Sequence, residues 1–257
     1  EINQLLVAKA REGKVVARLK GGDPYVFGRG AEEAEELVEA GIAFEVVPGV
    51  TSAVAAPAYA GIPLTHRKYA SSVTFITGHE DPTKPGSVHN WPALAAAAST
   101  LVFFMGMKNL HEISGKLIAA GRPGTTPTAV IRWGTTCRQR TLATTLEKVA
   151  DEAERLKLEA PALLVVGDVV RLRPTLNFFE SRPLLGKRIV VTRAREQASD
   201  LVAQLTALGA CCLEFPTIAI EPLGDYTEVE AAILKLGEVD WLVFTSVNGV
   251  EHFWRQL

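Results

Sequence analysis

The chain has 257 residues, of which 47% are hydrophobic and 22% are charged, and its formal net charge is −2. This composition can bury a sizeable core, and the nearly balanced charge gives no general argument for binding nucleic acid or a membrane surface. No apolar run reaches the ~18–20 residues that cross a bilayer, and no signal peptide is visible, so we expect a cytoplasmic protein. The cysteines and histidines show no zinc-ligand spacing, so we predict no metal site.

Short apolar runs rich in β-branched residues alternate with helix-period segments along the whole chain. The runs are bounded by Gly, Pro, Asp or Asn, which is typical of strands. We predict strands at residues 15–19, 44–47, 73–77, 101–104, 128–131, 163–166, 189–192, 213–218 and 241–245. We predict helices at residues 31–40, 110–120, 146–156 and 196–208, and an amphipathic helix at the C-terminal end. This alternation indicates the α/β class, with helices packed on largely parallel sheets.

Two changes in the pattern suggest boundaries between parts of the chain. Near residues 171–187, an Arg-Pro-containing run ends one apolar strand, and a Leu-Leu-Gly-Lys run leads into a new one. A weaker boundary lies near residues 63–72, between two sheet-forming blocks. We therefore expect three parts, at residues 1–70, 71–175 and 184–257. Since the sequence begins at Glu1, we also expect it to be a piece of a longer protein.

The most informative stretch is LKGGDPYVFGRGAEE, at residues 19–33. Gly21 and Gly22 follow a predicted strand and let a ligand approach the backbone closely, while Asp23 can accept hydrogen bonds. In open α/β sheets, ligands bind at the carboxyl ends of strands, although Gly-Gly-Asp-Pro by itself is also an ordinary turn. Arg29 lies on a tight loop between two glycines. No third glycine completes a dinucleotide fingerprint, which disfavours a nicotinamide-dependent dehydrogenase.

Three further sites in the sequence carry candidate ligand-binding residues. Thr51 and Ser52, in PGVTSA, either cap the next helix or bind a ligand carboxylate together with the helix N-terminus. Because two successive strand ends each deliver a glycine-containing loop, the spacing favours one shared site. His66 and Arg67 begin a basic run, which is either a solvated loop or a clamp for an acidic substrate. Met105 follows a strand and is either core filler or a surface for a flat aromatic base.

Five segments in order resemble the tetrapyrrole methylase family over about residues 1–175: LKGGDPYVFGRG, PGVTSA, FFMG, GTTPTAVI and PALLVVGDVV. Within it, GGDPYVFGRG and HRKYASSVTFITGH resemble the uroporphyrinogen-III C-methyltransferases. Residues 184–257 resemble the opening of a uroporphyrinogen-III synthase, through LLGKRIVVTRAREQASDLVAQLTALGA and DWLVFTSVNGVEHFW. Taken alone, this last region also fits any small α/β domain.

The resemblance implies a two-subdomain methylase fold, divided into residues 1–70 and 71–175, followed by a partial flavodoxin-like α/β unit at residues 184–257. The family's N-terminal strand and its GPGDP-type loop have no match here, so we expect an incomplete cofactor site. S-adenosyl-L-methionine is expected in the cleft between the subdomains. The implied cofactor-binding residues are Gly21, Gly22, Asp23, Val26, Thr51, Ser52, Met105, Ala129 and Gly134. Arg29 and Glu32 are the catalytic candidates, and we add His66 and Arg67 as candidates for binding substrate carboxylates.

The implied activity is C-methylation of uroporphyrinogen III to precorrin-2, a step of porphyrin biosynthesis that leads to siroheme or cobalamin. The synthase part would be a lyase that makes this substrate from hydroxymethylbilane, so we expect a multifunctional enzyme and, from the family, a homodimer. Two alternatives remain open. One is another precorrin methylase or a diphthine synthase of the same fold, and the other is a non-catalytic module that binds the cofactor or a tetrapyrrole.

Overall fold

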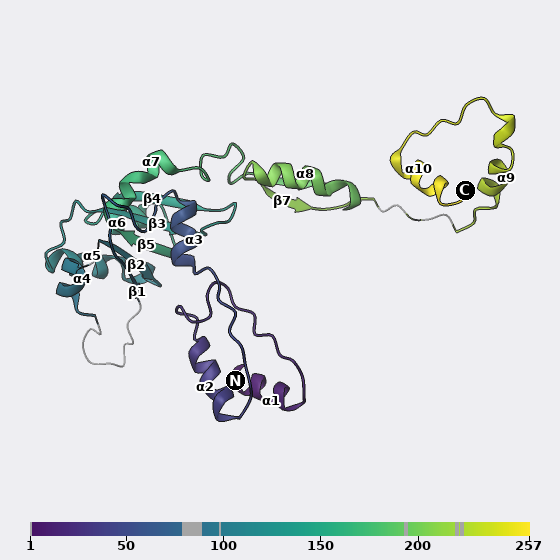
Figure 1. Cartoon of the computed structure of the whole chain (residues 1–257). Coiled ribbons are helices and arrows are strands. Elements are labelled where there is room, and N and C mark those ends of the chain that lie inside the picture. The colour runs from purple at the N-terminus through teal and green to yellow at the C-terminus, as the bar shows by residue number, and fades with distance from the viewer. Residues whose placement is uncertain (1, 79–88, 98, 193–194, 219–220, 222–223) are drawn as a thin grey trace. The chain divides into compact units, whose positions relative to one another are not determined.

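The computed structural model describes residues 2–78, 89–97, 99–192, 195–218, 221 and 224–257. The chain divides into two compact units, Glu1–Lys187 and Arg188–Leu257 (Figure 1). Both units combine strands with helices, so the predicted α/β class is confirmed.

The first unit contains a mixed sheet of five strands in the order β1-β2-β5-β3-β4. The strands are β1 (Val73–Thr77), β2 (Thr100–Phe104), β3 (Pro127–Arg132), β4 (Arg140–Thr145) and β5 (Ala162–Val166). Only β1 and β2 are parallel, while β2–β5, β5–β3 and β3–β4 are antiparallel. The prediction of a largely parallel sheet is therefore wrong here. Residues 133–139, which join β3 to β4, are too few for the crossover that parallel neighbours need.

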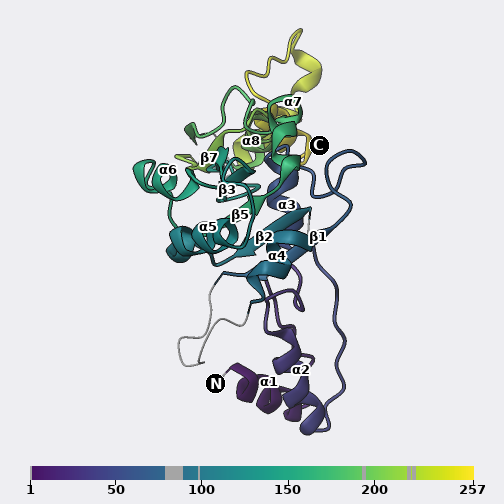
Figure 2. The ribbon, with the colours of Figure 1, turned by 90° about the vertical axis from the view of Figure 1, so that its left-hand side faces the viewer.

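Helices cover both faces of this sheet (Figures 1 and 2). One face packs against α4 (Trp91–Ala97), α5 (Leu110–Ala119) and α6 (Val149–Arg155), with Leu101, Phe103 and Val130 in its core. The other face packs against α3 (Ser52–Tyr59), with Val102, Ala129 and Ile131 in its core. Successive residues of β2 and β3 thus alternate between the two faces, as the pleat of a strand requires.

The N-terminal part of this unit contains two helices, α1 (Ile2–Arg11) and α2 (Gly30–Glu39), which contact each other. Glu33, on α2, forms ion pairs with Lys20 at 3.1 Å and with Arg18 at 3.2 Å. The strands predicted at residues 15–19 and 44–47 do not form within the described structure. These segments have strand-like composition, but an extended segment forms a sheet only where a neighbouring backbone pairs with it.

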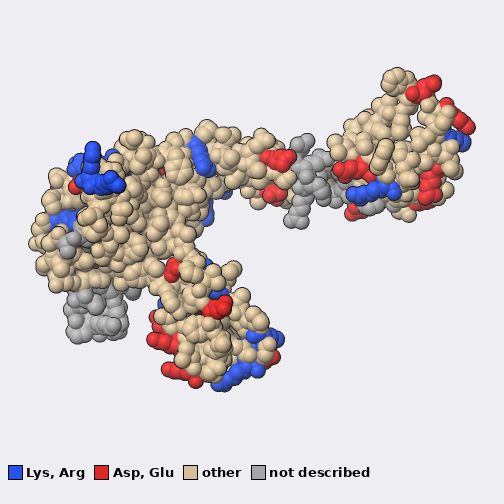
Figure 3. All heavy atoms as spheres, in the orientation of Figure 1, with Lys and Arg blue, Asp and Glu red and all other residues tan. Residues whose placement is uncertain are grey.

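Charged side chains of both signs lie close together over the N-terminal helices (Figure 3). Glu12, for example, pairs with Lys9 at 2.8 Å and with Lys14 at 2.6 Å. Such exposed pairs contribute about 0–1 kcal/mol each, so this surface adds little to the stability of the fold.

Short helical turns complete the first unit. They are η1 (Met107–Asn109), η2 (Asp168–Leu172) and α7 (Arg173–Leu176). The segment from α7 to residue 182 returns to α3, because Tyr59 packs against Phe178 and Phe179 with ring centroids 5.7 and 4.8 Å apart.

The second unit contains a parallel pair of strands, β6 (Arg188–Val191) and β7 (Cys211–Glu214), joined through α8 (Arg195–Ala207). It also contains α9 (Thr227–Ile233), η3 (Leu236–Glu238) and α10 (Val247–Trp254). The strand predicted at residues 213–218 lies earlier, and the one predicted at 241–245 does not form. The C-terminal helix does form, and Ser246 caps it by accepting a hydrogen bond from Gly249 N at 3.0 Å. None of the helices described in either unit is long and apolar enough to span a membrane.

Candidate functional site

Two glycine-containing loops cross in direct contact beside α3. A Cβ placed on Gly49 would lie 2.3 Å from the carbonyl oxygen of Gly22, so only glycine fits at position 49. Gly22 itself has φ of +82°, and a Cβ there would lie 3.6–3.8 Å from the backbone of Val50, Thr51 and Ser52. The structure thus brings together the two loops for which the sequence predicts a shared site.

The carboxylate of Asp23 links these loops. Its Oδ2 accepts a hydrogen bond from Gly49 N at 3.0 Å, and its Oδ1 accepts one from Tyr25 N at 2.8 Å. These bonds stabilise the charged form and hold the pKa of Asp23 below its ordinary value, with the Gly49 bond as the larger cause. Asp23 therefore fixes the shape of the site through the backbone, whatever it also binds.

Arg29 is presented by a loop that closes on the carbonyl group of Pro24. Gly30 N donates to Pro24 O at 3.0 Å, and a Cβ on Gly28 or Gly30 would lie 2.4 or 2.6 Å from that oxygen. Arg29 itself has φ of +57°, and its side chain is 84% exposed. Its Nε lies 3.7 Å from Glu32 Oε1, so the two predicted catalytic residues are neighbours.

The N-terminus of α3 carries Thr51 and Ser52 without a capping side chain. Thr51 is the N-cap residue, with extended backbone angles, but its side chain makes no capping hydrogen bond. The capping role considered from the sequence is therefore not observed for Thr51. The first amide groups of a helix have no intrahelical acceptor, so an uncapped N-terminus attracts an anionic group.

A pocket of about 280 Å³ lies between the Arg29 loop and the end of β2. Met105, which directly follows β2, is 56% exposed and lines it together with Arg29 and Glu32. Phe27 also lines the pocket, and its ring packs against Phe104 with centroids 4.8 Å apart. The pocket is thus lined on one side by the apolar side chains of Met105 and Phe27 and on the other by the Arg29–Glu32 ion pair.

Several residues with left-handed backbone conformations line the 280 Å³ pocket or flank Gly134. Among the described non-glycine residues, those with positive φ are Phe27, Arg29, Met105, Trp133, Thr135 and Lys157. The first three line the 280 Å³ pocket, and Trp133 and Thr135 flank Gly134. Such conformations cluster at functional sites, where surrounding contacts must hold them.

The remaining predicted site residues lie elsewhere. Ala129 is fully buried in the core beneath α3, and Gly134 packs against α3 so closely that a Cβ would lie 2.3 Å from Ala56 Cβ. His66 is held in a turn, where its Nδ1 accepts from Lys68 N at 3.2 Å. Of the predicted site residues, Arg29, Glu32 and Met105 line the 280 Å³ pocket, whereas Gly21, Gly22, Asp23, Val26, Thr51, Ser52, His66, Arg67, Ala129 and Gly134 do not.

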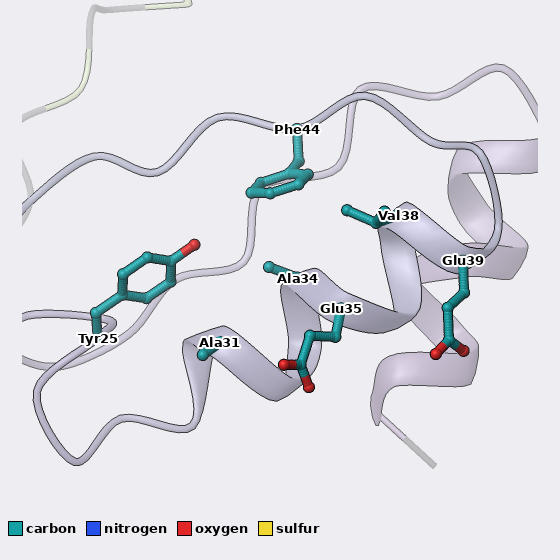
Figure 4. Close-up of a pocket in the computed structure, with 7 residues that line it drawn as sticks. All are labelled: Tyr25, Ala31, Ala34, Glu35, Val38, Glu39 and Phe44. Carbon is teal, nitrogen blue, oxygen red and sulfur yellow. The ribbon is translucent and has the colours of Figure 1, made fainter.

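A second groove, of about 520 Å³, runs along α2. Ala34 and Val38 point toward Phe44, whereas Glu35 and Glu39 point away from it (Figure 4). Tyr25 lines this groove and also the smaller pocket. Tyr25 and Phe27 are not among the site residues predicted from the sequence, although both belong to the same glycine-rich stretch as Arg29. An aromatic residue between glycines is the signal that marks them.

Comparison with known proteins identifies the family. Residues 1–150 match the model of the tetrapyrrole (corrin/porphyrin) methylases. The chain belongs to this family. Residues 199–257 match the model of the uroporphyrinogen-III synthase HemD. Both parts of the resemblance found in the sequence are therefore confirmed.

Individual relatives agree with this assignment. The chain is 44% identical over 257 residues to a uroporphyrinogen-III C-methyltransferase of Bacillus subtilis (strain 168), covering 100% of this chain and 52% of that protein. It is 58% identical over 177 residues to an S-adenosyl-L-methionine-dependent uroporphyrinogen III methyltransferase of Methanosarcina barkeri, covering 69% of each. The chain therefore spans about half the length of the B. subtilis relative.

The fold agrees as well. The structure of uroporphyrin-III C-methyl transferase from Thermus thermophilus, solved with S-adenyl homocysteine, is 37% identical with a TM-score of 0.58. The match covers 66% of this chain and 74% of that one.

Replacing Gly49 by alanine tests the crossing of the two loops. The new Cβ would meet Gly22 O at 2.3 Å, so the two loops must separate. We expect Gly49→Ala to lower the free energy of unfolding by about 1–3 kcal/mol, measured by urea denaturation. Gly115→Ala is the control, because its Cβ meets nothing within 4 Å in α5, and it should be neutral or stabilising by about 0.5–1 kcal/mol. Equal stability of the two variants would contradict the crossing.

Lowering the pH tests the role of Asp23. Since the pKa of Asp23 is lower in the folded protein, its stabilising effect is complete above the ordinary value of about 3.9 and is lost as the pH falls through the folded-state pKa. We expect the amides of Gly49 and Tyr25 to lose protection from hydrogen exchange over that acidic range, after correction for intrinsic rates. Asp23→Asn should show reduced protection at neutral pH and no such transition. A wild-type profile that is flat into the acid range would exclude the role.

Proposed function

We propose that this protein transfers methyl groups from S-adenosyl-L-methionine to carbon atoms of uroporphyrinogen III, giving precorrin-2. The observation that carries the proposal is the junction of the Gly22 loop with the uncapped N-terminus of α3, beside the pocket lined by Met105 and Arg29. The names of the B. subtilis and M. barkeri relatives support the same substrate and cofactor.

The residues present fit S-adenosyl-L-methionine, an adenosine joined to a methionine, in three respects. The backbone at Gly21 and Gly22 has no side chain to keep a ligand away, and the first amides of α3, at Thr51 and Ser52, suit a carboxylate. The exposed thioether of Met105 suits a flat base. We therefore propose Gly21, Gly22, Asp23, Val26, Thr51, Ser52, Met105 and Gly134 as the cofactor-binding residues. Ala129 has no exposed surface, so we assign it to the support beneath α3.

When bound, S-adenosyl-L-methionine supplies an electrophilic methyl group. A pyrrole carbon of a porphyrinogen is already nucleophilic, so the main task of the protein is to hold the two partners in line. Arg29, which is exposed at the pocket, offers a guanidinium fork for a substrate carboxylate. Glu32 Oε1, 3.7 Å from Arg29 Nε, offers an acceptor for the proton that leaves the methylated ring. His66 and Arg67 remain proposed contacts for more distant carboxylates.

We extend the proposal to the organisation of the protein. Residues 1–70 and 71–175 would be the two methylase subdomains, and residues 184–257 part of a uroporphyrinogen-III synthase. That lyase would make the methylase substrate from hydroxymethylbilane, so the protein would be multifunctional. The match of residues 199–257 to HemD supports this division. We also propose a cytoplasmic homodimer without nucleic-acid or membrane partners, on the grounds of family resemblance and a net charge of −2.

Calorimetric titration with S-adenosylhomocysteine tests the cofactor site, in the full natural protein that contains this sequence. We expect binding by the wild type and none by Gly22→Val, because a branched side chain at φ of +82° would lie against the start of α3. Gly41→Val is the matched control, since it has similar backbone strain at φ of +68° but nothing within 4 Å of its Cβ, and it should bind normally. A wild type that does not bind would refute the proposal.

A product assay with uroporphyrinogen III tests the catalytic assignment. We expect Arg29→Ala to lower turnover by about 10²-fold, the scale of a lost positioning or proton-transfer group, with S-adenosylhomocysteine affinity unchanged. Arg11→Ala, at the end of α1, should retain normal turnover. Wild-type turnover by Arg29→Ala would remove Arg29 from the mechanism, and the absence of methylated product from the wild type would favour the non-catalytic alternative.

A further inference from the structure

A partly buried polar network connects the segment after α7 to the loop at residues 133–136. At its centre, the side chain of Glu180 is 13% exposed and forms an ion pair with Arg173 at 2.7 Å. Glu180 Oε1 also accepts hydrogen bonds from Gln139 Nε2, at 2.8 Å, and from the hydroxyl group of Thr141. No part of the proposed methyl transfer uses this cluster, so its charge and burial need another explanation.

Gln139 carries the network to the loop. It is only 3% exposed, and its Oε1 accepts a hydrogen bond from Thr135 N at 2.7 Å. A carboxylate can only accept, so Glu180 fixes the amide group of Gln139 with its NH₂ toward Glu180 and its oxygen toward Thr135. The partly buried carboxylate of Glu180 thereby determines that the Gln139 oxygen faces the loop.

The loop is one that needs such support. Trp133 and Thr135 have φ of +52° and +69°, and Gly134 between them packs against Ala56 of α3. Left-handed conformations of non-glycine residues persist only where surrounding contacts determine them. The hydrogen bond to Thr135 N is therefore a direct restraint on the position of Gly134.

The same segment also holds the far end of α3. Arg173 Nη1 donates to Ala60 O at 2.6 Å, and a Cβ on Gly61 would lie 2.7 Å from the backbone of Leu176 and Asn177. The helix that presents Thr51 and Ser52 at its start is thus fixed at its end by the residue that pairs with Glu180. The network therefore contacts two elements of the proposed cofactor site, the loop at residues 133–136 and the end of α3.

We propose that Gln139 and Glu180 are positioning residues for the cofactor, acting through the loop at residues 133–136 and through α3. This inference rests on the proposed cofactor site. On this proposal, the segment at residues 173–182 contributes to cofactor binding without touching the cofactor. It does so by holding the loop at residues 133–136 and α3 in place.

The test uses four variants of the full natural protein and three measurements. The variants are Gln139→Ala, Glu180→Gln, the exchanged pair Gln139→Glu with Glu180→Gln, and the control Glu159→Gln. The control makes the same change as Glu180→Gln at a carboxylate that is 79% exposed and pairs with Arg132 at 3.5 Å. The measurements are hydrogen exchange of the Thr135 amide without ligand, the dissociation constant for S-adenosylhomocysteine, and the KM for uroporphyrinogen III.

We expect Gln139→Ala to expose the Thr135 amide and to weaken S-adenosylhomocysteine binding about tenfold, the scale of one lost buried hydrogen-bond partner. The KM for uroporphyrinogen III should stay within twofold, which general unfolding would not produce. Glu180→Gln should act in the same direction. The exchanged pair should recover at least half of the lost affinity, because a carboxylate at position 139 can accept hydrogen bonds both from Thr135 N and from the new amide at position 180. Glu159→Gln should match the wild type.

Two results would overturn the inference: unchanged protection of Thr135 in Gln139→Ala, or wild-type affinity despite lost protection. A wild type that does not bind S-adenosylhomocysteine would instead overturn the proposed function. In that case the cofactor role of both residues fails with it, while the exchange data show separately whether they hold the loop.

Discussion

The candidate site depends on one steric constraint, the crossing of two backbones at Gly22 and Gly49. A single Cβ at position 49 would lie 2.3 Å from the carbonyl oxygen of Gly22. The carboxylate of Asp23 holds the crossing by accepting hydrogen bonds from Gly49 and Tyr25. Since Tyr25 begins the loop that carries Arg29, the same carboxylate connects the start of α3 to the pocket at the end of β2.

The helix α3 transmits this constraint to the sheet because its buried face is made of small residues. Ala53 and Ala56 are at most 4% exposed, and both pack over Ala129 and its neighbours in the sheet. Small side chains allow close approach but make few contacts, so the helix needs support at its ends. Gly134 supplies contact along its side, and Arg173 supplies a charge-assisted hydrogen bond at its C-terminus. On the opposite face of the sheet, large residues such as Phe103 and Leu117 form an apolar core that takes no part in the site.

Much of the fold and part of the site could be predicted from the sequence. The helices at α2, α5 and α8 follow from their apolar spacing, and the strands β1, β2, β3 and β5 follow from short β-branched runs between turn residues. The glycines around Asp23 and Arg29 indicated loops that approach other groups closely. Five short segments in the right order were enough to indicate the tetrapyrrole methylase family, which the family match confirms.

The sequence by itself determined many of the helices, four strands of the five-stranded sheet and the glycine loops, because these depend on neighbouring residues. Only the tertiary structure decided how they pair. It made most of the five-stranded sheet antiparallel, and it left residues 15–19 and 44–47 without partners among the described strands. It placed Phe27 against Phe104, and Gln139 against Glu180. These contacts join residues distant in sequence, and such pairs leave no local pattern, because their geometry exists only once the sheet and α3 have packed.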